Sequence, residues 1–161
     1  MSDRGKIRAL LLAVAVLAAI IAGLAYKFIV VGSTEKSADG RTAIVLAPAE
    51  RDLVLAEMRG FVAALQQITA ALAKDDMQAV AKAARDIGMA MSHEVPPALI
   101  AKLPLDFKQL GFATHADFDQ IAQDAIDLGD PKHTLDQLGS TLGRCVACHS
   151  TYRLKETSRV E

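Results

Sequence analysis

The residues best suited to chemistry lie in one short stretch, Cys145-Val146-Ala147-Cys148-His149, which holds both cysteines of the 161-residue chain. Two thiols three residues apart can form thioethers with the two vinyl groups on one edge of a porphyrin, and the histidine that follows then reaches the iron. On a helix, Cys145 and His149 are four positions apart and share a face. The spacing therefore predicts one covalently attached haem c, held by Cys145 and Cys148, with His149 below the iron.

Three other interpretations of this stretch compete with haem. A zinc site needs about four ligands, and the remaining histidines, His93, His115 and His133, form no ligand-like cluster. A thioredoxin-like redox pair would need strands alternating with helices, and the chain shows no such pattern. A structural disulfide would explain neither the adjacent histidine nor the tight spacing. Haem is the preferred interpretation.

Composition favours a helical protein. Hydrophobic residues make up 52% of the chain but aromatic residues only 4%, with no tryptophan, whereas strands are enriched in β-branched and aromatic residues. The length suits one compact domain plus an appendage. Residues 32–161 hold 14 basic and 18 acidic residues, a formal charge of −4, with no basic tract interleaved with aromatic residues. Nucleic-acid binding is therefore not expected.

An apolar segment precedes this acidic part of the chain. Residues 9–26 are 18 uncharged and mostly apolar positions, and residues 28–31 extend the run beyond Lys27. The segment is just long enough to span a bilayer. We expect residues 1–31 to form an uncleaved, single-pass membrane anchor.

The charges around this segment predict its orientation. Arg4, Lys6 and Arg8 precede it and Lys27 lies near its far end, so the positive-inside rule places the haem motif outside the cytoplasm. The expected location is the bacterial inner membrane, with the haem domain in the periplasm, where c-type haem is attached and free thiols would oxidise. The alternative is a soluble periplasmic protein, released by cleavage of a signal peptide at the small-residue sequence Gly23-Leu24-Ala25.

Four later segments carry apolar residues at alternating steps of three and four. They are separated by Lys74-Asp75-Asp76, by His93-Glu94-Val95-Pro96-Pro97 and by Gly129-Asp130-Pro131, which favour helix ends. Such repeats are typical of helices that pack at shallow angles. We therefore expect an all-α fold: an antiparallel up-down-up-down four-helix bundle over residues 50–161, preceded by the transmembrane helix and by a linker at residues 32–49.

The fourth segment carries the haem motif and continues as Ser150-Thr151-Tyr152-Arg153-Leu154-Lys155. A four-helix bundle with one Cys-x-x-Cys-His on its last helix, followed by an aromatic and a basic residue, resembles the class II cytochromes c, the cytochrome c-prime family and its low-spin relatives. The resemblance covers about residues 50–158. It implies haem thioethers at Cys145 and Cys148 and His149 as the proximal iron ligand. The membrane anchor is a departure, because many members are soluble.

Low-spin members of this family use a methionine on the first helix as the other axial ligand, and Met58 in Ala56-Glu57-Met58-Arg59 matches that position. The start of the first helix and the end of the fourth lie at the same end of such a bundle. Met58 is seven residues into a helix starting near residue 51, and His149 about eight residues before an end near residue 157, so both lie roughly 10–12 Å deep. Met58 is therefore predicted to be the sixth iron ligand, with plain core packing as the alternative.

An iron bound by His149 and Met58 has no open position. The expected function is therefore a one-electron carrier in a periplasmic or membrane-associated chain, with redox proteins as partners and no enzyme activity. The alternative is a five-coordinate c-prime-type protein that binds nitric oxide or carbon monoxide. A peroxidase would need a polar acid or base beside the iron, and Val54, Phe61 and Val62 near Met58 are apolar. Whether the domain forms a homodimer stays open.

Other polar residues receive weaker predictions. His115 lies beside the apolar repeat of the third segment, so it is expected to be partly exposed or hydrogen-bonded. Three arginines could pair with the haem propionates, although each is better explained as a surface charge; they are Arg59, Arg144 and Arg153. His93 and His133 receive no role.

Overall fold

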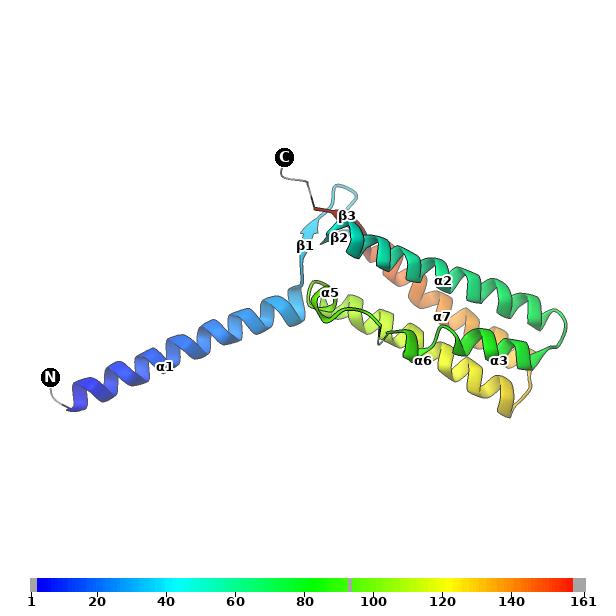
Figure 1. The fold of residues 1–161 in the computed structure, drawn as a ribbon, viewed down its shortest axis with the longest axis horizontal. Coiled ribbons are helices and arrows are strands. Elements are labelled where there is room, and N and C mark those ends of the chain that lie inside the picture. The colour runs from blue at the N-terminus through cyan, green and yellow to red at the C-terminus, as the bar shows by residue number, and fades with distance from the viewer. Residues whose placement is uncertain (1–2, 93, 158–161) are drawn as a thin grey trace.

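The computed structural model describes residues 3–92 and 94–157; His93 lies outside the described residues. The chain is mostly helical (Figure 1). Its helices are α1 (Asp3–Tyr26), the π-helix η1 (Lys27–Val31), α2 (Pro48–Leu72), α3 (Met77–Arg85), α4 (Met89–Ser92), α5 (Pro97–Ile100), α6 (Leu105–Asp127) and α7 (Pro131–Thr151). Its strands are β1 (Thr34–Lys36), β2 (Thr42–Leu46) and β3 (Tyr152–Glu156).

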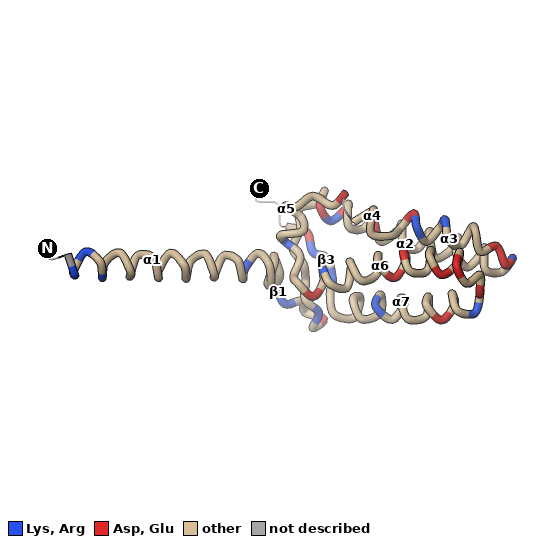
Figure 2. Tube along the Cα trace, turned by 90° about the horizontal axis from the view of Figure 1, so that it is seen from below, with Lys and Arg blue, Asp and Glu red and all other residues tan. Residues whose placement is uncertain are grey.

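Helices α2, α3, α6 and α7 lie side by side (Figures 1 and 2), and the four apolar repeats in the sequence fall on them, the second continuing beyond α3 into α4. Helix α2 packs against α3, α3 against α6, and α6 against α7. Ile68, Val80, Phe118 and Ile121 meet in the core between them, each no more than 1% exposed. The first and third predicted helical segments are confirmed in position, whereas the second is interrupted and the fourth ends earlier than predicted.

Local signals set the starts of two of these helices. The side chain of Asp76 accepts a hydrogen bond from the backbone N–H of Ala79 (3.0 Å) at the start of α3. At the start of α7, Asp130 accepts one from Lys132 N–H (2.9 Å), and Pro131 occupies the first turn. Both are N-caps, which satisfy N–H groups that the helix leaves unpaired.

The second apolar repeat was expected to form one helix through Met91, but α3 ends at Arg85 and a new turn of helix begins at Met89. The cause is a carboxylate from another helix. Asp119 on α6 accepts a hydrogen bond from Met89 N–H (3.0 Å), and its side chain fills the space where a Cβ on Gly88 would lie. A helix start that is capped from a distant segment leaves no local pattern in the sequence.

The expectation of an all-α fold misses a small sheet. Strand β2 pairs antiparallel with β1, with Thr34 opposite Ile44, and parallel with β3, with Ile44 opposite Leu154. Ile44 and Leu46 are 0% exposed and pack beside Val54 of α2. The segment expected as a linker is therefore folded against the domain, and it joins the chain that follows the haem motif.

The prediction that the last helix reaches residue 157 is wrong. Tyr152 has an extended backbone (φ −121°, ψ 156°) and begins β3. Arg41, just before β2, donates hydrogen bonds from Nη1 to the backbone carbonyls of His149 (3.2 Å) and Tyr152 (3.4 Å). These contacts satisfy acceptors that the helix end would otherwise leave unpaired. His149 consequently lies two residues before the end of α7.

Among the described residues, one helix is long and apolar enough to span a membrane, the 28-residue stretch Arg4–Val31, and none of its apolar window is buried. At about 1.5 Å per residue it is roughly 42 Å long, which exceeds the hydrocarbon core of about 30 Å. Figure 2 shows basic residues towards its two ends and none between them. A signal sequence would share these features, so the structure supports an apolar N-terminal helix of either kind.

Candidate haem site

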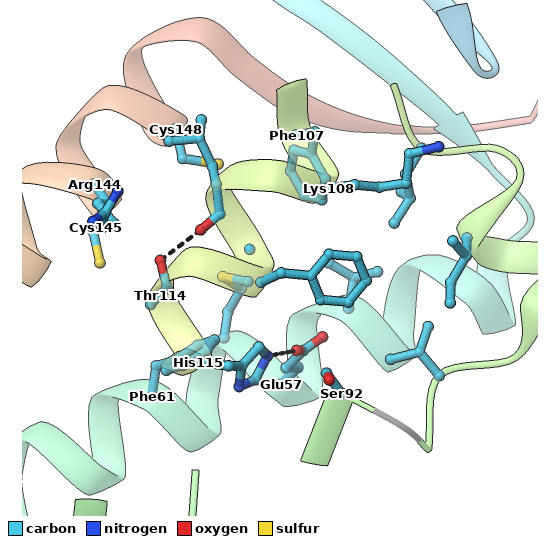
Figure 3. A pocket seen from close by; sticks show the side chains of 18 of the residues that line it. Glu57, Phe61, Ser92, Phe107, Lys108, Thr114, His115, Arg144, Cys145 and Cys148 are labelled. Atoms are coloured by element: carbon cyan, nitrogen blue, oxygen red, sulfur yellow. Dashed lines mark hydrogen bonds and ion pairs between the residues drawn. The ribbon is translucent and has the colours of Figure 1, made fainter. Parts of the chain in front are cut away.

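A cavity lies between α2, α6 and α7, at the end of the domain that holds α5 and the sheet (Figure 3). It comprises about 840 Å³ of space, and part of this space is open to solvent. All four predicted haem residues line it: Met58, Cys145, Cys148 and His149. The structure thus brings the residues of the sequence motif and the predicted sixth ligand to one cavity.

Most of the cavity wall is apolar. Val54 and Phe61 come from α2, and Phe107 and Phe112 from the first half of α6. Phe107 packs edge-on against Tyr152, the aromatic residue three positions after the haem motif, with ring centroids 5.4 Å apart. Aromatic and aliphatic walls with few polar groups suit a flat, largely apolar cofactor.

The environment of the two cysteines bears on the competing interpretations. Both are half-buried and they are not joined to each other. Burial raises the pKa of Cys145, and burial followed by the proximity of Cys145 raises the pKa of Cys148 to about 11. Both side chains are therefore thiols at neutral pH, whereas redox-active pairs need a lowered pKa and a thiolate. The disulfide and the thioredoxin-like site receive no support.

A metal site built from protein ligands alone is also unsupported. Within residues 3–92 and 94–157, no group of three or more His, Cys, Asp or Glu side chains is placed to hold a metal ion. The lining holds two thiols and an imidazole on α7 and a thioether on α2, besides Glu57 and His115, which pair with each other. The thiols, the α7 imidazole and the thioether are the groups that covalent attachment and axial ligation of a haem require, so the residues present fit that cofactor.

Met58 lines the cavity from α2, whereas the Cys-x-x-Cys-His residues line it from α7. It is partly buried, packs against both apolar core clusters and lines the cavity together with His149. The predicted equal depth of Met58 and His149 was counted from helix ends that the structure does not have. Met58 lies ten residues after the start of α2, and His149 lies only two residues before the end of α7. Their placement on one cavity is what supports Met58 as a ligand.

The sequence analysis missed a largely buried pair beside Met58, formed by His115 of α6 and Glu57 of α2. His115 is only 2% exposed, and its Nε2 lies 2.7 Å from Oε1 of Glu57, the residue next to Met58 (Figure 3). Its Nδ1 lies 2.7 Å from the carbonyl oxygen of Ile87. Because both partners are acceptors, both ring nitrogens donate. The expectation that His115 is hydrogen-bonded is confirmed, but the partly exposed alternative is wrong.

The charge of this pair follows from its surroundings. Burial alone would lower the pKa of His115, but hydrogen bonds to Glu57 and to the Ile87 carbonyl, with the nearby charge of Asp119, raise it above its ordinary value. A protonated His115 can donate from both nitrogens. With both nitrogens engaged, it has none to offer an iron or a substrate. The sequence signal was its position three residues before the buried Phe118, on the same helix face.

We expect His115→Leu to lower the free energy of unfolding by about 2–3 kcal/mol, because it leaves the Glu57 carboxylate and a backbone carbonyl half-buried without a donor. His133→Leu is a matched control: His133 pairs with Asp124 at 3.2 Å, but its side chain is 41% exposed, so the loss should stay below about 1 kcal/mol. Urea unfolding of the three proteins measures both values. If both variants lose the same free energy of unfolding, the buried His115–Glu57 pair contributes no more to stability than the exposed His133–Asp124 pair.

Two of the three arginines that could pair with haem propionates lie near the cavity. Arg144 lines it and donates from Nε to Asp117 (2.6 Å), a hydrogen bond that raises the pKa of the guanidinium. Arg153 lies with Arg41 and Arg51 around an adjoining hollow that also borders Met58, Cys148 and His149. Guanidinium groups at this rim suit carboxylates such as propionates. Arg59 does not line either space.

No protein-family model, curated protein or solved structure matches the chain. The assignment of the site therefore depends on the chemistry of the residues gathered on the cavity.

Proposed function

We propose that this protein is a monohaem c-type cytochrome that carries single electrons. The observation that supports the proposal is the placement of both motif cysteines, His149 and Met58 on one apolar cavity. Cys145 and Cys148 would hold the haem through thioethers, with His149 as its proximal ligand and Met58 as its sixth. When bound, the haem supplies a one-electron couple between ferric and ferrous iron.

The chain's own residues shape that couple. Val54, Phe61 and Phe107 give the site apolar walls, and a low local dielectric strengthens the effect of nearby charges. The thioether of Met58 is a soft ligand, which favours the ferrous state and raises the reduction potential. An iron held by both His149 and Met58 would have no open position for a substrate, which argues for electron transfer without catalysis.

The arrangement of α2, α3, α6 and α7 supports assignment to the class II cytochromes c. We infer an antiparallel up-down-up-down bundle, in which the fourth helix carries the haem motif and the first carries the sixth ligand. Two features depart from that pattern: the three-stranded sheet, which pairs the chain before α2 with the chain after the haem motif, and the apolar N-terminal helix.

A second candidate is a five-coordinate protein that binds nitric oxide or carbon monoxide. Met58 packs against both apolar core clusters, as a residue with a packing role would, and an iron without its thioether would keep a site for a gas. The resonance and absorption spectra of the oxidised and reduced protein separate the two. Electron transfer predicts low-spin iron in both states, whereas high-spin iron in the wild type would favour gas binding.

We further propose that the helix Arg4–Val31 is an uncleaved anchor that keeps the haem domain on the periplasmic face of the inner membrane. Its length and apolar composition support this location. We expect alkaline extraction to leave the full-length protein in the membrane fraction. Release of the protein by this treatment, or an N-terminus that begins after Ala25, would contradict the anchor and favour a soluble periplasmic carrier.

A further inference from the structure

The N-terminal helix joins the domain through a close backbone contact. Gly32, directly after η1, is buried and has φ +67°. A Cβ at this position would lie within 2.8 Å of backbone atoms of Leu103 and Pro104. The next residue, Ser33, donates from its backbone N–H to the carbonyl of Lys102 (2.7 Å). Only glycine can adopt this positive φ and also allow backbone atoms to come so close. The junction between the N-terminal helix and the domain is therefore tightly packed and not a flexible linker.

A lysine connects the apolar helix to the cavity. Lys108 of α6 donates from Nζ to the backbone carbonyl of Ile29 (2.8 Å), and Ile29 belongs to the stretch that is apolar enough to span a membrane. Lys108 also lines the cavity. A single side chain therefore links the wall of the proposed haem site to the end of the apolar helix.

The cavity occupies the part of the domain closest to this junction. Figures 1 and 2 show α1 leaving the domain at the end that holds α5 and the sheet. The α6 wall of the cavity runs from Phe107 to His115, about 12 Å along the helix axis. The far end of the domain, where α6 is followed by α7, has no part in the cavity wall.

We propose, on the basis of the haem and anchor assignments above, that this junction docks the rim of the haem cavity on the phospholipid surface and holds it at a fixed height. Lys27 and Lys108 lie at the level where the apolar helix ends, and lysines there suit the phosphate groups of a bilayer. The close backbone contact at the buried Gly32 fixes the orientation of the domain relative to the N-terminal helix, so the cavity rim stays near the membrane surface. Electron partners must then meet this protein at the membrane surface.

Fluorescence quenching measures this height. Full-length haem-loaded protein is placed in phosphatidylcholine–phosphatidylglycerol vesicles that carry a fluorophore on the lipid headgroup, and the haem acts as quencher. A flexible Gly-Ser insertion of about twelve residues between Val31 and Gly32 would allow a separation of roughly 20 Å. We expect strong quenching by the wild type and a loss of about half of it on insertion, since the domain then spends its time farther from the lipid.

A glycine pair provides the matched control. Gly32→Ala forces the junction apart and should reduce quenching, whereas Gly40→Ala, also at positive φ (+84°) but with no atom within 4 Å of the added Cβ, should leave it unchanged. Equal quenching by the wild type and the insertion variant overturns the docked junction. A wild-type protein without a haem absorption band would instead overturn the haem assignment. Release of the wild-type protein from the membrane by alkaline extraction would overturn the anchor.

Discussion

Met58→Ala is expected to convert the iron from low-spin to high-spin while leaving the thioethers in place. Among the described residues that line the cavity, Met58 alone carries a thioether, and the substitution removes it. Carbon monoxide should then bind faster by more than about tenfold, because it no longer has to displace a ligand whose removal costs more than about 1.4 kcal/mol. Absorption and resonance spectra report the spin state, and stopped-flow mixing reports the binding rate.

Met91→Ala is the matched control for this change. Met91 is also a partly buried methionine packed on the helical core, but it does not line the cavity. Both substitutions should cost about 2 kcal/mol of stability through lost packing, while only Met58→Ala changes the spectra. A wild type that is already high-spin, with a spectrally silent Met58→Ala, would reduce Met58 to a packing role and favour the gas-binding candidate.

The double substitution Cys145→Ser with Cys148→Ser is expected to abolish covalent haem. Serine has nearly the same size as cysteine but forms no thioether with a vinyl group. Without the cofactor, the mostly apolar walls of the cavity would lack a packing partner, and lost apolar packing costs stability. Haem staining after denaturing electrophoresis and thermal unfolding measure the two losses.

Val146→Ser tests whether the loss is specific to the thiols. Val146 lies between the two cysteines but is 69% exposed and does not line the cavity. This variant should keep its haem stain and its unfolding temperature. Haem staining that survives in the double cysteine variant would contradict attachment through these residues.

Features with a local signal were predictable from the sequence. The apolar repeats placed α2, α6 and the start of α7 close to their observed bounds, because one apolar face per helix is enough to specify such a segment. The haem attachment proposed for Cys145 and Cys148 also depends on spacing within one helix, and it stays a prediction. Helix starts marked by Asp76 and Asp130 also followed from nearby residues.

The features that were missed depend on contacts between distant segments. Strand β3 exists because it pairs with β2, more than a hundred residues earlier in the chain, and Arg41 satisfies the carbonyls at the end of α7 from the same distance in sequence. The break before Met89 depends on Asp119 of another helix. The burial of His115 was missed because its partner Glu57 lies on α2, 58 residues earlier in the chain. Such pairings cannot be derived from the periodicity of any single segment.

Denaturing mass spectrometry of the mature protein tests the central claim most directly. The protein is produced in cells that are competent in cytochrome c maturation, and denaturation removes any cofactor that is not covalently bound. We predict a mass equal to the polypeptide, 17.1 kDa for the full chain, plus one haem, since the chain has a single pair of cysteines. The mass of the bare polypeptide would contradict the haem assignment and, with it, the proposed function.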